Sequence, residues 1–413
     1  MFLKNLQLKN FRNYNDINLN FNKNTIIIAG DNGQGKTNLL ESIYYISAGK
    51  SHRANIQEEL IKWESDFAII RALFINDDVD SKEDGHLIEL ELRKDGTYKI
   101  KIGGVHYSRK SDFISILPSV IFSPDDLRII KSGPSYRRGF LDDILERLDR
   151  GRDFSILKNN YQKVLNQRNS LFKSISGDID LKNNSTIDTW NESLVSYGHR
   201  IIENRVKLIE GFKKDFSSFI NLFFPGMKAE IKYVFSWNRR FSSDNNITSL
   251  KYKESIDEPS ALKNTFIGEM EEVPESSLIS FSQMFILKLK ENLKKELIYK
   301  TTIIGPHRDD FKILINGKDI KSFGSQGQQR IAAVCLKLCE INVLKEKRKT
   351  NPVLLLDDVL SELDKDREKL LIGILKNSKF QTFITTAIPD IFKDLELDST
   401  ELFFIKENKI FQK

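Results

Sequence analysis

The residues from Gly30 to Thr37 read GDNGQGKT, a glycine-rich run that ends in a lysine and a hydroxyl residue. The run lies between the apolar stretch 26–29, which we predict to be a strand, and a stretch whose apolar residues recur at helical spacing. Glycines let backbone N–H groups turn inward around phosphates, and the start of a helix adds its positive dipole. The sequence therefore predicts a phosphate-binding loop, with a chance match as the alternative.

Each part of this loop has a predicted role in binding ATP. Lys36 is expected to reach the β- and γ-phosphates and to act in catalysis, and the hydroxyl of Thr37 is expected to meet Mg²⁺. The residues predicted to bind the nucleotide are Gly30, Asp31, Asn32, Gly33, Gln34, Gly35, Lys36 and Thr37.

A pair of acids, Asp357 and Asp358, ends the apolar stretch 353–356, which we predict to be a buried strand. A phosphate loop needs an acidic partner: the first carboxylate can hold the Mg²⁺ shell, and the second can orient an attacking water. We therefore predict Asp357 as a metal ligand and Asp358 as a catalytic residue. Taken alone, two neighbouring acids at a strand end would also fit a capped turn.

The hexapeptide SQGQQR, residues 325–330, precedes a predicted helix and resembles the signature motif of ABC ATPases. In such a motif the serine and the backbone amides at a helix start hold the γ-phosphate of a nucleotide that another subunit binds. We therefore predict that Ser325, Gly327 and Gln328 contact nucleotide across a head-to-tail dimer. Residues 361–364, SELD, lie where ABC proteins place their D-loop along the same interface.

The composition is that of a folded globular protein, with 40% hydrophobic and 30% charged residues among 413. The 64 Lys and Arg exceed the 58 Asp and Glu, so the chain carries +6 and leans toward polyanionic partners. No secretory signal is recognisable, and no stretch approaches the ~18 apolar residues that span a bilayer. We expect a cytosolic protein without a membrane partner, in which Cys335 and Cys339 are buried helix thiols.

The elements around these motifs predict an α/β head with an insertion. Alternating apolar residues predict strand pairs near residues 2–21 and 88–102, and strands alternate with helices after residue 301. Between them, long polar stretches carry apolar residues at helical spacing. We predict an ATPase head with a mixed sheet, formed by residues 1–141 and 298–413, and an inserted, mainly helical lobe over residues 142–297.

These motifs resemble those of the RecF family of ABC/SMC-type ATPases, and the matches extend in order over nearly the whole chain. The helical middle carries the fewest of them. The matching segments are Leu8–Tyr14 (LKNFRNY), the phosphate loop, Gly49–Arg53, Phe122–Leu127 (FSPDDL), Gly133–Asp142, Gly305–Asp310 (GPHRDD), SQGQQR and LLLDDVLSELD.

The resemblance implies an ATP-dependent DNA-binding protein of recombinational repair and replication-fork maintenance. Such a protein dimerises on ATP to clamp DNA at single-strand gaps or junctions, on single- and double-stranded DNA. It helps load recombinase with RecO and RecR and supports the SOS response. Asp358 replaces the glutamate of transporter-type ATPases, and Thr385 with Thr386 stands where a switch histidine would be expected. We therefore predict slow, DNA-stimulated hydrolysis, with ATP as a conformational switch.

Other interpretations stay open at this point. Arg12 is predicted to contact the nucleotide, or else to cover a sheet edge. The arginines 137, 138, 147, 150 and 152 are candidates for a stripe that binds DNA phosphates, or for a solvated helix face. For the whole chain, a different SMC-like ATPase, a transporter ATPase and a scaffold protein are the alternatives to a RecF-like function.

Overall fold

The computed structural model describes residues 1–54, 56–75, 85–114, 116–148, 153–175, 185–238, 280–360, 363–376, 380–387, 400–407 and 409–412. Its contacts divide the chain into two compact units, one of Met1–Leu127 with Arg330–Lys413 and one of Arg128–Gln329. We predicted that residues 1–141 and 298–413 form the head. The contacts instead place residues 128–141 and 298–329 in the second unit. The reason is that α3 (Pro134–Leu148) packs on β10 (Asp310–Ile315) and on α5 (Ser185–Phe223).

The first unit contains a six-stranded mixed sheet in the order β15-β14-β3-β13-β12-β8. All neighbours are parallel except β15, which pairs antiparallel with β14. Strands β8 and β12 are buried along their whole length, as their apolar runs at 120–122 and 353–356 require in a sheet covered on both faces. The strands are β3 (Thr25–Ala29), β8 (Ser119–Phe122), β12 (Val353–Asp357), β13 (Thr382–Thr386), β14 (Thr400–Lys406) and β15 (Lys409–Gln412).

A second sheet of the first unit is antiparallel, with six strands in the order β2-β1-β4-β5-β6-β7. It confirms both predicted strand pairs: β1 pairs with β2, and β5 pairs with β6 around the turn at Asp95 and Gly96. Its strands are β1 (Phe2–Phe11), β2 (Tyr14–Asn20), β4 (Phe67–Ile75), β5 (Gly85–Arg93), β6 (Tyr98–Ile102) and β7 (Val105–Tyr107).

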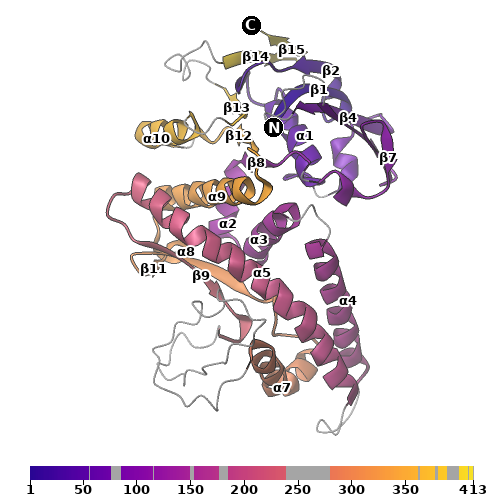
Figure 1. The fold of residues 1–413 in the computed structure, drawn as a ribbon, viewed down its shortest axis with the longest axis vertical. Helices are drawn as coiled ribbons and strands as arrows, with labels where there is room; N and C mark the ends of the chain where they lie inside the picture. The colour runs from indigo at the N-terminus through magenta and orange to yellow at the C-terminus, as the bar shows by residue number, and fades with distance from the viewer. Residues whose placement is uncertain are drawn as a thin grey trace. The chain divides into compact units, whose positions relative to one another are not determined.

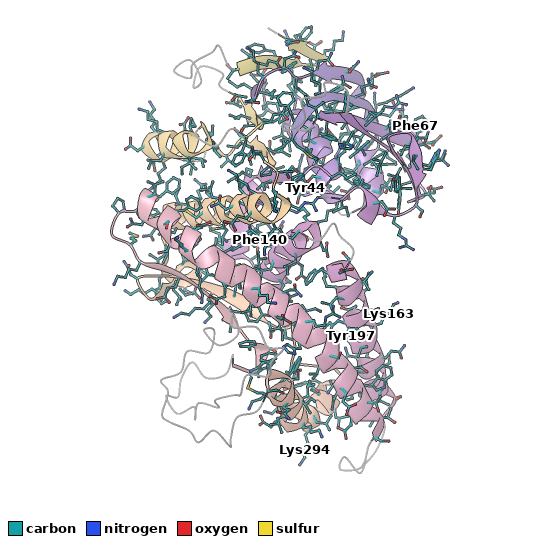
Figure 2. The ribbon with its side chains drawn as sticks, in the orientation of Figure 1. Tyr44, Phe67, Phe140, Lys163, Tyr197 and Lys294 are labelled. Atoms are coloured by element: carbon teal, nitrogen blue, oxygen red, sulfur yellow. The ribbon has the colours of Figure 1, made fainter. Side chains whose placement is uncertain are left out.

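Helix α1 (Lys36–Ala48) joins the two sheets into one core. It contacts β8, β12 and β13 of the mixed sheet and β4 of the antiparallel sheet, near the indigo end of the ribbon in Figure 1. One cluster of buried side chains includes residues of both sheets and of this helix, and Tyr44, labelled in Figure 2, belongs to it. The remaining helices here are α10 (Lys365–Lys376) and the short 3₁₀ turns η1 (Gln57–Leu60), η2 (Lys110–Asp112) and η3 (Pro124–Asp126).

The second unit is mainly helical and also contains a three-stranded antiparallel sheet, β11-β10-β9. Helices α4 and α5 lie side by side, and α5 also packs on β9 (Figure 1). Phe140 of α3, labelled in Figure 2, and Phe212 of α5 have ring centroids 6.3 Å apart. The further elements are α2 (Leu127–Lys131), α4 (Asp153–Ser174), β9 (Ala229–Val234), η4 (Ser236–Asn238), α7 (Phe281–Tyr299), β11 (Lys318–Asp319) and α8 (Ile320–Phe323).

Helix α9 (Gln326–Arg348) begins in the second unit and continues into the first. Cys335 and Cys339 lie on it as buried free thiols, which confirms their predicted place in a helix. Among the described residues, no helix combines the length and the apolar character that a membrane crossing demands.

Candidate nucleotide-binding site

The phosphate loop occupies the turn between β3 and α1, as the sequence predicts. Gly35 caps α1 with a φ of 108°, a backbone conformation that favours glycine. No side chain caps the helix, and its first turn contains no acidic residue. The N–H groups and the positive end of the dipole therefore remain available to an anion at this helix start.

The ammonium group of Lys36 lies inside the loop. Its Nζ donates hydrogen bonds to the carbonyl oxygens of Gly30 at 2.6 Å and Asp31 at 3.0 Å. Burial lowers the pKa of Lys36, whereas the nearby carboxylates of Asp358 and Asp357 act in the opposite direction. The loop thus holds a cation at its centre, while the loop residues 31–33 are exposed to solvent.

Two further chain segments form hydrogen bonds to the phosphate loop. We did not predict these contacts from the sequence. The side chain of Asn13 donates to the carbonyl oxygen of Gln34 at 3.2 Å, and the hydroxyl of Tyr14 donates to that of Gly35 at 3.0 Å. The backbone N–H of Glu407 donates to the side chain of Gln34 at 2.8 Å. The LKNFRNY motif contains Asn13 and Tyr14, but only the fold brings them against the loop.

Arg12 forms an ion pair with α1. Its guanidinium donates to both carboxylate oxygens of Glu41, at 2.8 and 2.7 Å, and to the carbonyl oxygen of Glu59 at 2.7 Å. Burial raises the pKa of Glu41, but hydrogen bonds from Arg12 and Ser51 outweigh it and lower that pKa below its ordinary value. The structure therefore gives Arg12 a partner in the helix that follows the loop; a direct contact with nucleotide stays a prediction.

Asp357 lies next to Thr37, although 320 residues separate them in sequence. The Thr37 hydroxyl donates to Oδ1 of Asp357 at 2.8 Å, and Asp357 is only 6% exposed. Burial raises the pKa of Asp357, and the hydrogen bonds from Thr37 and Thr385 act in the opposite direction. A carboxylate and a hydroxyl so placed supply the hard oxygen ligands that Mg²⁺ prefers beside phosphates.

Asp358 follows directly and adopts a left-handed backbone with a φ of 52°. Its N–H donates to the hydroxyl of Thr385 at 2.9 Å. The strand β12 therefore ends in a sharp turn at this acid. The negative charge of Asp358 acts to raise the pKa of Lys36, against the effect of burial.

The predicted signature segment forms the start of α9 in the second unit. Ser325 and Gln328 cap each other: the N–H of Gln328 donates to Oγ of Ser325 at 3.2 Å, and the N–H of Ser325 donates to the Gln328 side chain at 2.9 Å. Ser325 and Gln326 are exposed, and Gly327 is half-buried. The start of this helix is therefore accessible to an anion from outside the unit.

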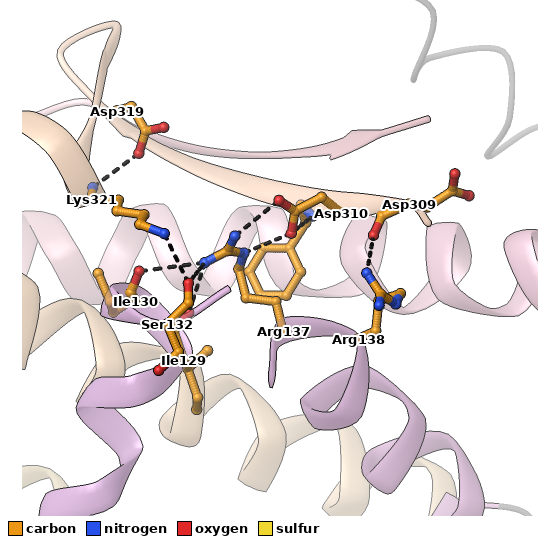
Figure 3. Close-up of polar contacts among 10 residues, drawn as sticks. Ile129, Ile130, Ser132, Arg137, Arg138, Asp309, Asp310, Asp319 and Lys321 are labelled. Atoms are coloured by element: carbon orange, nitrogen blue, oxygen red, sulfur yellow. Dashed lines mark hydrogen bonds and ion pairs between the residues drawn. The ribbon is translucent and has the colours of Figure 1, made fainter. Parts of the chain in front are cut away.

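Two of the five candidate arginines, Arg137 and Arg147, are buried, so for these two neither the DNA-binding stripe nor the solvated helix face is right. Arg137 is 7% exposed and pairs with Asp310 through two hydrogen bonds, at 2.6 and 2.9 Å (Figure 3). Arg147 is 4% exposed. Arg138 donates to the carbonyl oxygen of Asp309 at 2.8 Å. Burial and pairing remove Arg137 and Arg147 from any phosphate-binding face. Arginines 150 and 152, and residues 361 and 362 of the expected D-loop, lie outside the described residues.

The comparisons with known proteins identify the family of the chain. The family model for the RecF/RecN/SMC N-terminal domain matches residues 2–410. The DNA replication and repair protein RecF of Clostridium acetobutylicum is 38% identical over 399 residues, which cover 96% of each chain. The protein of the same name from Clostridium novyi is 36% identical over 413 residues and the whole of both chains.

Solved structures give the same result. The recombination mediator protein RecF-ATP in the RecFOR pathway superposes with a TM-score of 0.79 at 34% identity, covering 100% of this chain and 97% of that one. The Smc head domain of Pyrococcus furiosus matches with a TM-score of 0.51 at 18% identity, covering 100% of this chain and 96% of that one. This similarity shows the fold alone. The predicted ABC/SMC-type α/β fold is confirmed.

Proposed function

The chain belongs to the RecF/RecN/SMC N-terminal domain family, and within it to the RecF family, and we propose that it is an ATP-binding protein of DNA replication and repair. The observation that carries the proposal is the convergence of Lys36, Thr37 and Asp357. A buried lysine fills a loop at an uncapped helix start, and a buried carboxylate accepts a hydrogen bond from the adjacent threonine at 2.8 Å. These are the groups that bind a nucleoside triphosphate together with its metal ion.

In this proposal the backbone N–H groups of residues 30–37 surround the phosphates, and Lys36 neutralises their charge. Its ammonium, now bonded to carbonyl oxygens of the loop, exchanges these partners for phosphate oxygens. Thr37 and Asp357 would hold Mg²⁺, which neutralises charge on the β- and γ-phosphates when bound. Asp358 would orient the attacking water as a general base.

ATP is proposed to join two copies of the chain. Because Ser325 and the first turn of α9 are accessible, they would bind the γ-phosphate of the nucleotide held by a second copy. Binding of ATP would then close the dimer, and hydrolysis would open it. ATP thus acts as a conformational switch, because only the triphosphate reaches both subunits.

Hydrolysis is expected to be slow and stimulated by DNA. Asp358 is a short carboxylate on a backbone fixed by Thr385, so it reaches the water differently from a glutamate. We propose DNA at single-strand gaps or junctions as the substrate of the closed dimer, with RecO and RecR as partners, since two of the matched structures belong to RecF in the RecFOR pathway. A role in recombinase loading and the SOS response, in the cytoplasm, completes the proposal.

The test is the molecular mass in solution by light scattering, with and without ATP and Mg²⁺, with DNA binding followed in the same samples. Wild type should shift from monomer to dimer with ATP and bind DNA more tightly. Asp358→Asn should hold the dimer longer, because it removes the base and leaves the phosphate loop intact. A monomer that is indifferent to ATP in both proteins would contradict the switch.

A further inference from the structure

Thr385 stands at the carboxyl end of β13, directly beside Asp357 in the parallel register with β12. Its side chain is 2% exposed. A buried hydroxyl at a strand end needs hydrogen-bond partners, and the identity of those partners says what it holds in place. For Thr385 they are the two neighbouring acids of the site.

The hydroxyl oxygen of Thr385 accepts the N–H of Asp358 at 2.9 Å. The same oxygen lies 2.9 Å from Oδ1 of Asp357 and 3.3 Å from the carbonyl oxygen of Leu356. Since a hydroxyl has one proton, the shorter contact makes Asp357 its acceptor. One side chain thus accepts from the backbone of one acid and donates to the carboxylate of the other.

Both contacts act on groups that shape the site, the backbone turn at Asp358 and the carboxylate of Asp357. Asp358 has a φ of 52°, an uncommon conformation that aspartate adopts more readily than most residues, and its N–H is bonded to Thr385 in this turn. The carboxylate of Asp357 receives two hydroxyl donors on the same oxygen, one from Thr37 and one from Thr385. Losing the Thr385 donor leaves this carboxylate free to rotate about Thr37.

We propose that Thr385 is a positioning residue that sets both acids at once: it fixes the turn that aims Asp358 and the rotamer with which Asp357 meets the metal ion. This inference rests on the proposed function, because it assigns roles within the same site. Thr385 itself touches neither nucleotide nor metal in this scheme. Its effect passes through Asp357 and Asp358, as that of a hydrogen-bonding neighbour passes through a metal ligand.

The experiment compares Thr385→Val, which keeps the shape and removes the hydroxyl, with Thr385→Ser, which keeps the hydroxyl. Thr382→Val is the matched control, because Thr382 is a 5% exposed threonine of the same strand whose hydroxyl contacts only the carbonyl oxygen of Phe380 among the described residues, at 3.3 Å. ATP binding is measured by titration calorimetry over a series of Mg²⁺ concentrations and in EDTA. Hydrolysis is measured with saturating ATP, with and without DNA.

Thr385→Val should raise the Mg²⁺ concentration for half-maximal ATP affinity about 10- to 100-fold and lower kcat by a similar factor. Its ATP affinity in EDTA should stay within about twofold of wild type, because the phosphate loop and the start of α1 are unchanged. Thr385→Ser should restore both quantities to within about threefold. Thr382→Val should resemble wild type in Mg²⁺ dependence.

Equal Mg²⁺ dependence of ATP affinity in Thr385→Val and wild type would overturn the inference. Equal losses of ATP affinity and kcat in Thr385→Val and Thr382→Val would also overturn it, because they would indicate a general effect on the strand. If Thr385→Val does not fold, Thr385→Ala replaces it. A loss of Mg²⁺-dependent ATP binding or of hydrolysis in Thr385→Ser would also refute the role of the hydroxyl. Failure of the proposed function is distinct, because wild type itself would then neither bind nor hydrolyse ATP.

Discussion

The guanidinium of Arg137 in α3 and the carboxylate of Asp310 in β10, 173 residues apart in sequence, form a two-point ion pair in the interior of the second unit (Figure 3). Arg137 also donates through Nη1 to the carbonyl oxygens of Ile129, Ile130 and Ser132, at 3.4, 3.4 and 2.9 Å. These carbonyls lie at the C-terminal end of α2. One side chain therefore connects two helices and a strand, and it satisfies carbonyls that a helix end leaves open.

Removing Arg137 should destabilise the protein strongly. Arg137→Met removes the guanidinium that neutralises the buried carboxylate of Asp310, and breaking a buried ion pair in this way costs about 3–5 kcal/mol of unfolding free energy. Arg138→Met is the control, because its guanidinium donates to the carbonyl oxygen of Asp309, a neutral acceptor, and loss of such a hydrogen bond costs about 1 kcal/mol. Denaturant unfolding measures both. Equal effects of the two substitutions would contradict the importance of the ion pair.

Lys36→Ala should abolish the response to ATP. The substitution removes the ammonium group from the loop. A charge-assisted hydrogen bond contributes about 1.5–3 kcal/mol, so ATP affinity should fall about 10- to 100-fold. Titration calorimetry measures the affinity, and light scattering shows whether the dimer still forms. The melting temperature without nucleotide serves as the control for folding. Wild-type ATP affinity in a folded Lys36→Ala protein would argue against this loop as the nucleotide site.

Ser325→Asp and Ser325→Asn form a matched pair that separates helix capping from nucleotide contact. Both residues cap helices as well as serine does, so α9 should begin as before. Asp places a negative charge where the γ-phosphate of a second copy is expected, and such like-charge contact costs several kcal/mol. ATP-driven dimerisation should weaken about 100-fold or more in Ser325→Asp and only a few-fold in Ser325→Asn, by light scattering. ATP binding by the monomer should be unchanged in both. Indistinguishable dimers would show that Ser325 lies away from the phosphate.

His307 should make stability depend on pH in the acidic range. Burial lowers its pKa from the ordinary 6.5 to about 4, and its ring nitrogens contact the hydroxyl of Tyr161 at 2.6 Å and the carbonyl oxygen of Thr302 at 3.0 Å. The folded protein thus keeps this imidazole neutral, whereas the unfolded chain takes up a proton below 6.5. Stability associated with His307 is complete above 6.5 and is lost as the pH falls toward 4.

The measurement is the unfolding free energy of wild type and of His307→Gln at pH 7 and pH 5. His307→Gln is less stable at pH 7 because it loses native hydrogen bonds. Between the two pH values, however, wild type should lose about 2 kcal/mol more than the variant. The nearby Asp309, whose pKa burial raises to about 6, is present in both proteins, so its contribution largely cancels in the comparison. Parallel pH profiles would exclude His307 as the titrating group.

The phosphate loop illustrates how far local sequence reaches. Its glycines, lysine and threonine are contiguous, and the apolar stretches on both sides have the lengths of a strand and a helix, so the loop and its element context were predictable. The same holds for Asp357, since an uninterrupted apolar strand and the acids after it are adjacent in sequence. The loop and the strand end both depend on the backbone conformation of a few contiguous residues, so a local pattern is enough to predict them.

The arginines show the opposite case. Arg137 and Arg138 are neighbours in a charged stretch, and sequence alone left both a DNA-binding stripe and a solvated face open. Which of the two arginines faces the interior depends on how α3 packs against β10, a strand that follows more than 150 residues later. The assignment of residues 128–141 and 298–329 to the second unit has the same origin.

The sequence by itself determined the class of fold, the strand and helix on either side of residues 30–37 and the strand that ends at Asp357, because each is encoded in a short contiguous segment. Only the tertiary structure decided that Arg12 pairs with Glu41, that Tyr14 supports Gly35 and that Thr385 holds Asp357 and Asp358. The physical reason is that hydrogen bonds and burial depend on which distant strands become neighbours. Periodicity identifies a strand but does not specify the residue that will lie across from it.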